Sequence, residues 1–354
     1  MVGPDGSEGT AQGEEPGMPP TPNSKILSLL VLGCSALGLA IASFLYGRYR
    51  LRKIPIVMKP LPSGSGTDAT LARHVLRLAG EIGDRNYLLT EAQKAAASYI
   101  SDQFRLSGYE PIEQAYPVPG PKGEVELRNI LVKRPGSQPQ APILVVGAHY
   151  DTKSGTPGAD DNASGIAGLL ELARRFHGTT GSMELRFVAF NSEEPPFFGT
   201  RNMGSWQYAK ALKAEKRQVK GMISLEMLGC YRFEKGSQQY IPPLGLVYPN
   251  QGNYIAAVAN LGSRRLLNEF KSGFLAPKGT PLVAAALPRL VGVIGLSDQL
   301  SFWKHGFPAI MVTDTAFLRN PAYHQPDDIP TKLDYATMAD VVDGLEAALK
   351  AMTR

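Results

Sequence analysis

Cysteine is scarce in this sequence, with only two among 354 residues. So few cysteines exclude a disulfide-stapled miniprotein and any zinc module that needs four cysteine ligands. Histidine is also rare, with five residues, so any imidazole chemistry must come from that short set. Charged residues make up 19% of the chain, too few for a disordered protein, while 43% hydrophobic residues suffice for a buried core.

A strong charge of one sign is absent as well. The chain has 37 basic and 32 acidic residues, a net charge of +5. Outside a short basic patch at residues 48–59, no run of Lys and Arg resembles a nucleic-acid-binding surface. We therefore expect no nucleic-acid partner, and the sequence indicates no obligate protein partner.

The N-terminal part of the chain differs in composition from the rest. Residues 1–24 contain four acids, no base and many Gly and Pro, which predicts a disordered tail. Residues 26–46 carry no charge, and a helix of this length spans about 31 Å, enough to cross a bilayer core of about 30 Å. The bases that follow favour an uncleaved anchor over a signal peptide. Residues 47–66 are expected to form a juxtamembrane basic linker.

These features predict a single-pass membrane protein whose N-terminal span contacts lipid. The basic flank lies after the apolar run, and the positive-inside rule then places the rest of the chain in the cytoplasm. The basic patch is also expected to contact anionic lipid headgroups.

Strand and helix patterns alternate after residue 67. This alternation predicts an α/β fold with a mixed, mostly parallel sheet and helices on both faces. The expected strands are 127–133, 143–149, 183–191, 219–227 and 309–313, and the expected helices are 69–81, 90–106, 164–176, 199–212, 253–267 and 335–351.

Polar residues follow several of the apolar runs, and ligands of open α/β sheets bind at the carboxyl ends of strands. Each has a structural explanation when taken singly: an acid before a helix can be an N-cap, and adjacent acids can be a solvated pair. Glu226 is the exception, because an unpaired carboxylate at a buried strand end is costly. The residues concerned are His149, Asp151, Asp160, Asp161, Glu193, Glu194, Glu226, Tyr323 and His324.

Two histidines with three or more carboxylates suit zinc. They exceed what one ion needs, whereas two ions about 3.5–4 Å apart, bridged by a carboxylate and a water, would use them all. One acid must stay off the metal to take a proton from that water. The adjacent pair Glu193-Glu194 fits this division of roles.

The motifs GAHYD, GADDNASG, FNSEEPPFFGT, SLEM, SDQLSFW and YHQPDD, in this order, resemble those of the M28 family of co-catalytic zinc peptidases. The resemblance covers about residues 85–354. It implies a three-layer α/β/α domain of the zinc-dependent exopeptidase type at residues 67–354, two Zn²⁺ ions and a peptide substrate. Family habit also places such a domain outside the cytoplasm, against the charge rule.

The resemblance also implies a role for each residue. Asp161 is the expected bridge between the two ions, with His149 and Glu226 on the first zinc and Glu194 and His324 on the second.

Three further residues are expected to act beside the metals. Asp151 resembles the acid that orients the first imidazole. Glu193 resembles the general base, and Tyr323 resembles a tyrosine that donates to the oxyanion in some members. Asp160 is expected to support the ligands or shape the loop.

Two positions depart from the family pattern. The motif SDH is Ser297-Asp298-Gln299 here, which changes the surroundings of the metals and not their ligands. Glu226 is one methylene longer than the Asp found in many members.

Hydrolysis of N-terminal peptide bonds is the leading functional hypothesis. A carboxypeptidase or dipeptidase on the same scaffold would need a cation for the substrate carboxylate, for which Arg201, Arg232 and Arg289 are candidates. A glutaminyl-cyclase-like enzyme, which resembles a single-zinc relative, is a further alternative. A non-catalytic membrane scaffold is the least favoured, because the base and all expected ligands are present.

Overall fold

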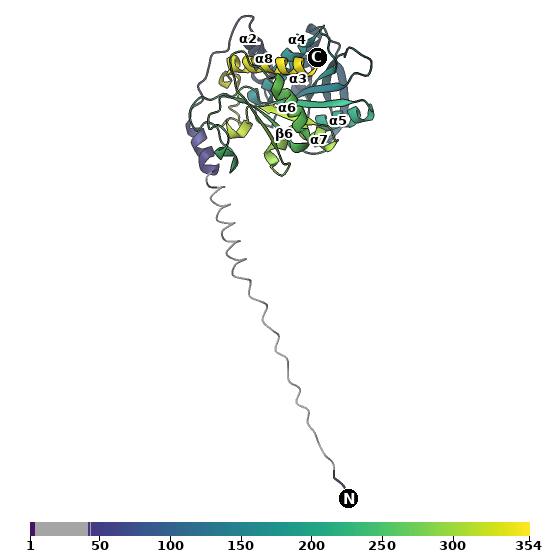
Figure 1. The fold of residues 1–354 in the computed structure, drawn as a ribbon, viewed down its shortest axis with the longest axis vertical. Coiled ribbons are helices and arrows are strands. Elements are labelled where there is room, and N and C mark those ends of the chain that lie inside the picture. The colour runs from purple at the N-terminus through teal and green to yellow at the C-terminus, as the bar shows by residue number, and fades with distance from the viewer. Residues whose placement is uncertain (4–41, 43) are drawn as a thin grey trace. The chain divides into compact units, whose positions relative to one another are not determined.

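A computed structural model describes residues 1–3, 42 and 44–354 of the chain. The chain divides into two units, residues 1–46 and 47–354, and the second contains all the helices and strands named below. The predicted disordered tail, apart from residues 1–3, lies outside the described residues. Figure 1 shows the fold.

The centre of the second unit is an eight-stranded sheet with the order β1-β2-β4-β3-β5-β8-β6-β7. Strands β4, β3, β5 and β8 are neighbours and run parallel, while β1, β2 and β6 have antiparallel partners. The predicted mixed, mostly parallel sheet is therefore confirmed. The strands are β1 (Ile112–Gly120), β2 (Gly123–Arg134), β3 (Ile143–His149), β4 (Glu184–Phe190), β5 (Val219–Glu226), β6 (Ile255–Asn260), β7 (Leu282–Leu287) and β8 (Ala309–Thr313).

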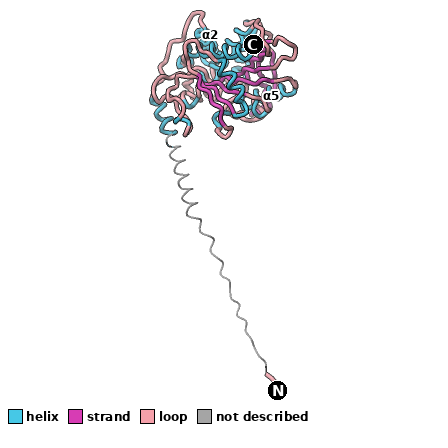
Figure 2. The backbone as a smooth tube through the Cα atoms, in the orientation of Figure 1, coloured by secondary structure: helices cyan, strands magenta, loops and turns pink. Residues whose placement is uncertain are grey.

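Helices cover both faces of this sheet, which gives the expected three layers (Figure 2). The larger core lies between the sheet and α2, α3, α4, α6 and α8, and the smaller core lies against α5 and α7. The helices are α2 (Thr67–Val75), α3 (Thr90–Leu106), α4 (Gly165–Phe176), α5 (Gly204–Ala214), α6 (Arg264–Gly273), α7 (Gln299–Lys304) and α8 (Tyr335–Met352), and the π-helical segment η1 (Leu76–Ile82) continues α2.

One predicted helix is wrong. Residues 253–267 were expected to form a single helix, but Ile255–Asn260 is strand β6, followed by the short turn η4 (Leu261–Ser263) and the start of α6. The run IAAVAN is short and apolar up to its last residue, Asn260, so its periodicity cannot distinguish a strand from a buried helix. Pairing with β7 and β8 decides its conformation.

The prediction of a single-pass membrane protein is also corrected. Within the described residues, none of the helices combines the length and the apolar character needed to cross a bilayer. Most of the predicted span 26–46 lies outside the described residues. The membrane localisation and the lipid contact are therefore not retained.

The expected linker at residues 47–66 contacts the domain that follows it. Leu51 is fully buried, and the Arg232 guanidinium donates a 2.7 Å hydrogen bond to the Ile54 carbonyl. The Lys59 ammonium lies 2.6 Å from the carboxylate of Asp334, which also caps α8. This segment thus packs on the surface near the C-terminal helix.

Candidate metal centre

Three adjacent parallel strands carry the predicted residues to one edge of the sheet. His149 is the last residue of β3, and Glu226 is the last residue of β5. Glu193 and Glu194 follow β4 after a short turn. Because the carboxyl ends of parallel strands meet at the same edge, these four side chains converge, and all four are buried.

Two loops complete the cluster. Asp161 lies in the segment η2 (Ala159–Ser164) before α4, at a kink where its own backbone is not helical, and His324 lies in the loop after β8. The carboxylate of Asp328 accepts the backbone N–H groups of Asp160 and Asp161 at 3.0 and 3.1 Å. This contact ties the loop that carries His324 to the loop that carries Asp161.

The five predicted ligands form two groups that share Asp161. In the first, His149 Nε2 lies 3.4 Å from Asp161 Oδ1 and 3.3 Å from Glu226 Oε2. In the second, His324 Nε2 lies 3.1 Å from Asp161 Oδ2 and 3.2 Å from Glu194 Oε1. Within each group the possible ligand atoms lie within 4.8 Å of one another.

This spacing fits zinc. Ligand atoms about 2.1 Å from one tetrahedral ion lie about 3.4 Å from each other, close to the distances found in both groups. Two atoms also lack other partners: His149 Nε2 and Asp161 Oδ2 are buried and accept or donate no hydrogen bond. A buried polar atom without a partner is costly, and a cation between the groups would remove that cost.

Charges inside the cluster perturb one another. Burial opposes the charged form of His149, but Glu226 and Glu193 outweigh it and raise the pKa of this imidazole. Burial likewise opposes ionisation of Asp161, yet His149 and His324 hold its pKa below the usual range. Asp161 is therefore ionised between the two imidazoles, as a bridging carboxylate must be.

Glu193 belongs to neither group. Its Oε2 lies 3.9 Å from His149 Nε2. Burial, with smaller contributions from Glu194 and Glu226, raises the pKa of the Glu193 carboxyl well above its usual value, although His149 acts in the opposite direction. A carboxyl beside the ligands with a raised pKa has the properties of a group that accepts and returns a proton.

Asp151 binds the backbone of the Glu193-Glu194 pair. Its Oδ1 and Oδ2 accept the backbone N–H groups of Glu193 and Glu194 at 3.1 and 3.0 Å. His149 Nδ1 lies 3.2 Å from the Asp151 carbonyl oxygen and 3.5 Å from Oδ1. The residue thus lies against the imidazole that it is predicted to orient, and it also binds the backbone of the acid pair.

One departure from the family pattern, Glu226, contacts the motif that contains the other, Gln299. The Ser297 hydroxyl donates a 2.6 Å hydrogen bond to Glu226 Oε2, the oxygen that lies beside His149. Its neighbour Asp298 is 1% exposed, and neither carboxylate oxygen has a hydrogen-bond partner. Burial raises the pKa of Asp298 to about 7. Gln299 donates instead to the Ile294 carbonyl.

Tyr323 lies beside the second group. Its ring stacks on the His324 imidazole, with centroids 3.8 Å apart and planes inclined by 17°. Burial and the nearby carboxylates raise the pKa of its hydroxyl, which therefore stays protonated and able to donate.

A third group of possible ligand atoms contains Asp160, Cys230 and Asp314. Asp160 accepts from the Gly229 N–H and the Asn320 amide, while Asp314 accepts from the N–H groups of Cys230 and Ala316. Burial raises the pKa of the Cys230 thiol. Every carboxylate oxygen already has a donor, so this group braces the loops and lacks the free acceptors of a metal site.

Arg85 braces the loops on the other side. Its fully buried guanidinium donates to the carbonyls of Tyr150, Pro157 and Gly158, and also to those of Leu78 and Gly83. The first three carbonyls belong to the segments that follow His149 and precede Asp161. The Arg85 side chain thereby links both segments to η1, the π-helical segment that continues α2.

Backbone strain is concentrated at the same edge. Ser192, Met227 and His324 have φ values of 53°, 53° and 58°, which non-glycine residues rarely adopt. Each of these residues is a predicted site residue or adjoins one. Such strain persists where surrounding contacts impose it, typically at functional sites.

The sequence interpretation assigned no role to three residues that hold the cluster: Arg85, Ser297 and Asp328. Ser297 and Asp328 lie inside quoted motifs, SDQ and PDD, and the motifs were the only signal for them. Arg85 lies in no motif and binds only backbone carbonyls.

Comparison with known proteins gives one family and several relatives. The profile of Peptidase family M28 matches residues 129–349. The protein named "Uncharacterized protein YfbL" from Escherichia coli (strain K12) is 40% identical over 259 residues, which cover 71% of this chain and 77% of that protein. A "Probable leucine aminopeptidase" from Arthroderma otae is 29% identical over 227 residues, or 60% of this chain, and the match spans about half (53%) of that protein.

Solved structures share the fold. The zinc aminopeptidase BSAP from Bacillus subtilis has a TM-score of 0.65 at 17% identity, covering 84% of this chain and 97% of BSAP. A glutaminyl cyclase from Fimbriiglobus ruber has a TM-score of 0.59 at 19% identity, covering 84% of this chain and 98% of the cyclase. At such identities the likeness concerns the fold alone, which both enzyme types use.

Proposed function

Since this chain belongs to peptidase family M28 and is accordingly a zinc metallopeptidase, we propose that it is a di-zinc aminopeptidase that hydrolyses N-terminal peptide bonds. The observation that carries this proposal is the pair of ligand groups joined through Asp161, with Glu193 beside them. His149 and Glu226 would hold one ion, His324 and Glu194 the other, and Asp161 both. Zinc bound there would supply Lewis acidity and a water acidified towards neutral pH.

The protein's own residues would move the proton. Glu193 takes a proton from the attacking water and returns it to the departing amine. Its carboxyl is available for this role because it is buried beside the two ligand groups and belongs to neither of them. Asp151 keeps this carboxyl in place through the Glu193 backbone. The Tyr323 hydroxyl would donate to the oxygen of the attacked carbonyl, where negative charge develops.

Charge favours an amine over a carboxylate as the terminal group of the substrate. The cluster contains the carboxyl groups of Asp151, Asp161, Glu193, Glu194 and Glu226, all buried. Even against the four positive charges of two zinc ions, five ionised carboxyl groups leave the cluster no excess positive charge with which to hold a substrate carboxylate.

The arginines considered for a carboxypeptidase have other surroundings. Arg232 donates to the carbonyl of Ile54, Arg289 lies 5.9 Å from the centroid of the Trp303 ring, and Arg201 is exposed. Among the residues described, none of the three makes a hydrogen bond or an ion pair with the cluster. Their positions therefore weaken the carboxypeptidase hypothesis.

A substrate panel tests the proposal. Purified chain should contain two zinc ions and cleave aminoacyl p-nitroanilides and free-amine dipeptides, while N-acetylated forms of the same compounds should react at least 100-fold more slowly. Equal cleavage of the N-acetylated and free-amine compounds would overturn the aminopeptidase assignment.

The same panel, extended to peptides with N-terminal glutamine, also tests for glutaminyl-cyclase activity. A peptide with N-terminal glutamine should lose that residue by hydrolysis and release free glutamine. Formation of pyroglutamyl peptide together with one zinc per chain would instead assign the cyclase activity. The complete first group around His149 argues for hydrolysis, since the cyclase-like alternative needs only one ion.

A further inference from the structure

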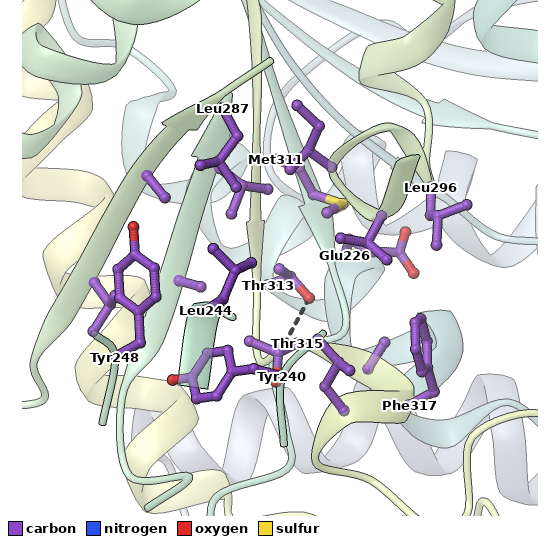
Figure 3. Close-up of a pocket in the computed structure, with 18 of the residues that line it drawn as sticks. Glu226, Tyr240, Leu244, Tyr248, Leu287, Leu296, Met311, Thr313, Thr315 and Phe317 are labelled. Carbon is purple, nitrogen blue, oxygen red and sulfur yellow. Dashed lines mark hydrogen bonds between the residues drawn. The ribbon is translucent and has the colours of Figure 1, made fainter. Parts of the chain in front are cut away.

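An apolar cavity opens beside the metal-ligand cluster. About 840 Å3 of space lies within and in front of it, part of this open to solvent, and Glu226 and Tyr323 form part of its wall. Figure 3 shows Glu226 and Leu296 on one side of the cavity and Tyr248 on the other. Leu287 of β7 and Met311 of β8 lie between them in this view. The cavity is thus continuous with the proposed site of hydrolysis.

The pattern of the edge strands explains why the cavity exists. Alternate residues of β6 and β7, such as Ala256, Val258 and Ala285, face the cavity. The residues between them, such as Ala257, face the core beneath α6 and α8. The short turns η3 (Leu244–Leu246), η5 (Gly292–Gly295) and η6 (Ala316–Leu318) border the cavity opposite the strands. Small alanine side chains on the strands leave the space unfilled.

The cavity is longer than any natural apolar side chain. It reaches from Glu226 on β5 across β8 and β6 to β7, and three interstrand spacings amount to about 14 Å. An extended alkyl chain advances about 1.3 Å per carbon, from bonds of about 1.5 Å, so about ten carbons fit this length. Even a methionine side chain reaches only about 5 Å by the same rise.

The walls offer little to a peptide backbone. The Tyr240 hydroxyl bonds the Pro249 carbonyl at 2.7 Å and the Tyr254 hydroxyl at 2.6 Å. The Thr315 hydroxyl bonds the Gln238 amide at 2.9 and 3.1 Å. Because these polar groups are already paired, a peptide in the cavity would leave its own N–H and C=O groups without partners. An alkyl chain has no such groups.

We propose that this cavity binds a linear alkyl chain, carried on the acyl side of the amide that the enzyme hydrolyses. The inference takes the kind of bond that is cleaved from the proposed function. That the substrate carries an alkyl chain is inferred from the cavity itself. Two kinds of substrate carry such a chain: an aminoacyl group with a long alkyl side chain, and a fatty acyl group joined to an amino acid. In both, hydrolysis breaks the C–N bond, adds OH to the acyl carbon and a proton to the nitrogen.

Two chain-length series test the proposal and distinguish the two kinds of substrate. One consists of 2-aminoalkanoyl amides of glycine and the other of N-alkanoyl glycines, each from four to fourteen carbons. In at least one series kcat/KM should rise about two- to fourfold per methylene and level off near ten carbons. A rise in the first series alone assigns the side chain. A rise in the second assigns the acyl group and, because N-alkanoyl glycines lack a free amine, also overturns the aminopeptidase assignment while leaving the cavity proposal intact. A flat response in both series overturns the proposal.

A binding measurement keeps this inference separate from the proposed function. Calorimetry on the Glu193→Gln variant measures binding without catalysis. Decan-1-ol should bind this variant at least tenfold more tightly than hexan-1-ol does. Absence of aminopeptidase activity in the unsubstituted, zinc-loaded chain, with alcohol binding intact, would refute the proposed function alone. Equal, weak binding of both alcohols would refute the cavity proposal alone.

A pair of matched substitutions locates the chain. Ala285→Leu adds bulk at the β7 end of the cavity and should shift the chain-length optimum downward by about three carbons. Ala351→Leu makes the same change at an exposed position of α8 and should leave both the optimum and the activity unchanged. An unchanged optimum in folded Ala285→Leu chain would show that the chain does not reach β7.

Discussion

Asp151 accepts the backbone N–H of Glu193 at 3.1 Å and, through its other oxygen, that of Glu194 at 3.0 Å. One carboxylate thereby sets the position of the proposed base and of a proposed ligand. Asp151→Asn replaces one of these acceptors with an NH2 group, which would face a backbone donor. We expect a 10- to 100-fold loss of zinc affinity and a larger loss of kcat.

Zinc titration against a chelator and steady-state kinetics measure the two effects of Asp151→Asn. Circular dichroism serves as the control for folding. A variant with normal kcat and normal zinc affinity would remove Asp151 from the positioning role.

Glu193 and Glu194 form a matched pair of adjacent acids with different predicted roles. Glu193→Gln should retain the zinc content and lose about 10²- to 10⁴-fold in kcat, because the amide cannot accept the proton. Glu194→Gln should lose zinc from the His324 group. Elemental analysis and kinetics on both variants check this, and identical behaviour of the two would contradict the assignment.

Glu226 and Ser297 provide a test of the longer side chain. Glu226→Asp withdraws the carboxylate by about 1.5 Å from His149 and from the Ser297 hydroxyl. We expect zinc bound at the His149 group to weaken by at least tenfold. Ser297→Ala keeps the carboxylate in reach and removes only the 2.6 Å hydrogen bond, so its loss should be smaller. A larger effect of the serine variant would reverse this interpretation.

The buried imidazole of His74 should make the free energy of unfolding depend on pH. Burial lowers its pKa to about 4 from an ordinary value of 6.5, with Glu171 opposing the shift, and its Nδ1 lies 2.7 Å from the Tyr99 hydroxyl. The unfolded chain therefore binds the proton more readily between pH 6.5 and 4. This contribution to stability is complete above pH 6.5 and is lost as the pH falls, by at most about 1.4 kcal/mol per pH unit.

The variant His74→Gln should flatten this part of the profile. Denaturant unfolding of both chains at several pH values between 4 and 7 gives the difference, in which the titration of the metal ligands cancels. An unchanged slope would mean that His74 does not supply it.

The sequence predicted the juxtaposition of the site residues because the signal was local. Each of His149, Glu193 and Glu226 ends or follows an apolar run, and parallel strands bring such ends together. The bracing residues have no comparable signal. Asp328 accepts from backbone N–H groups 167 and 168 positions away. The Arg85 guanidinium donates to carbonyls 65 to 73 positions away, besides two nearby ones.

The edge of the sheet was harder to predict for a related reason. The run IAAVAN in β6 has no polar residue before its last position, Asn260, to mark a face, and it becomes a strand through its pairing with β7 and β8. The cavity, which depends on the alternate faces of β6, therefore could not be derived from the sequence pattern either. Tertiary pairing, rather than local preference, fixes this region.

Asp161 belongs to both ligand groups, with Oδ1 beside His149 and Oδ2 beside His324. Two cations held there would be loaded cooperatively, because the first would fix the carboxylate orientation that the second requires. Zinc uptake should then follow one steep isotherm instead of two separate steps. Half-loaded protein would be rare, and a modest fall in free zinc would switch the population between empty and fully loaded molecules.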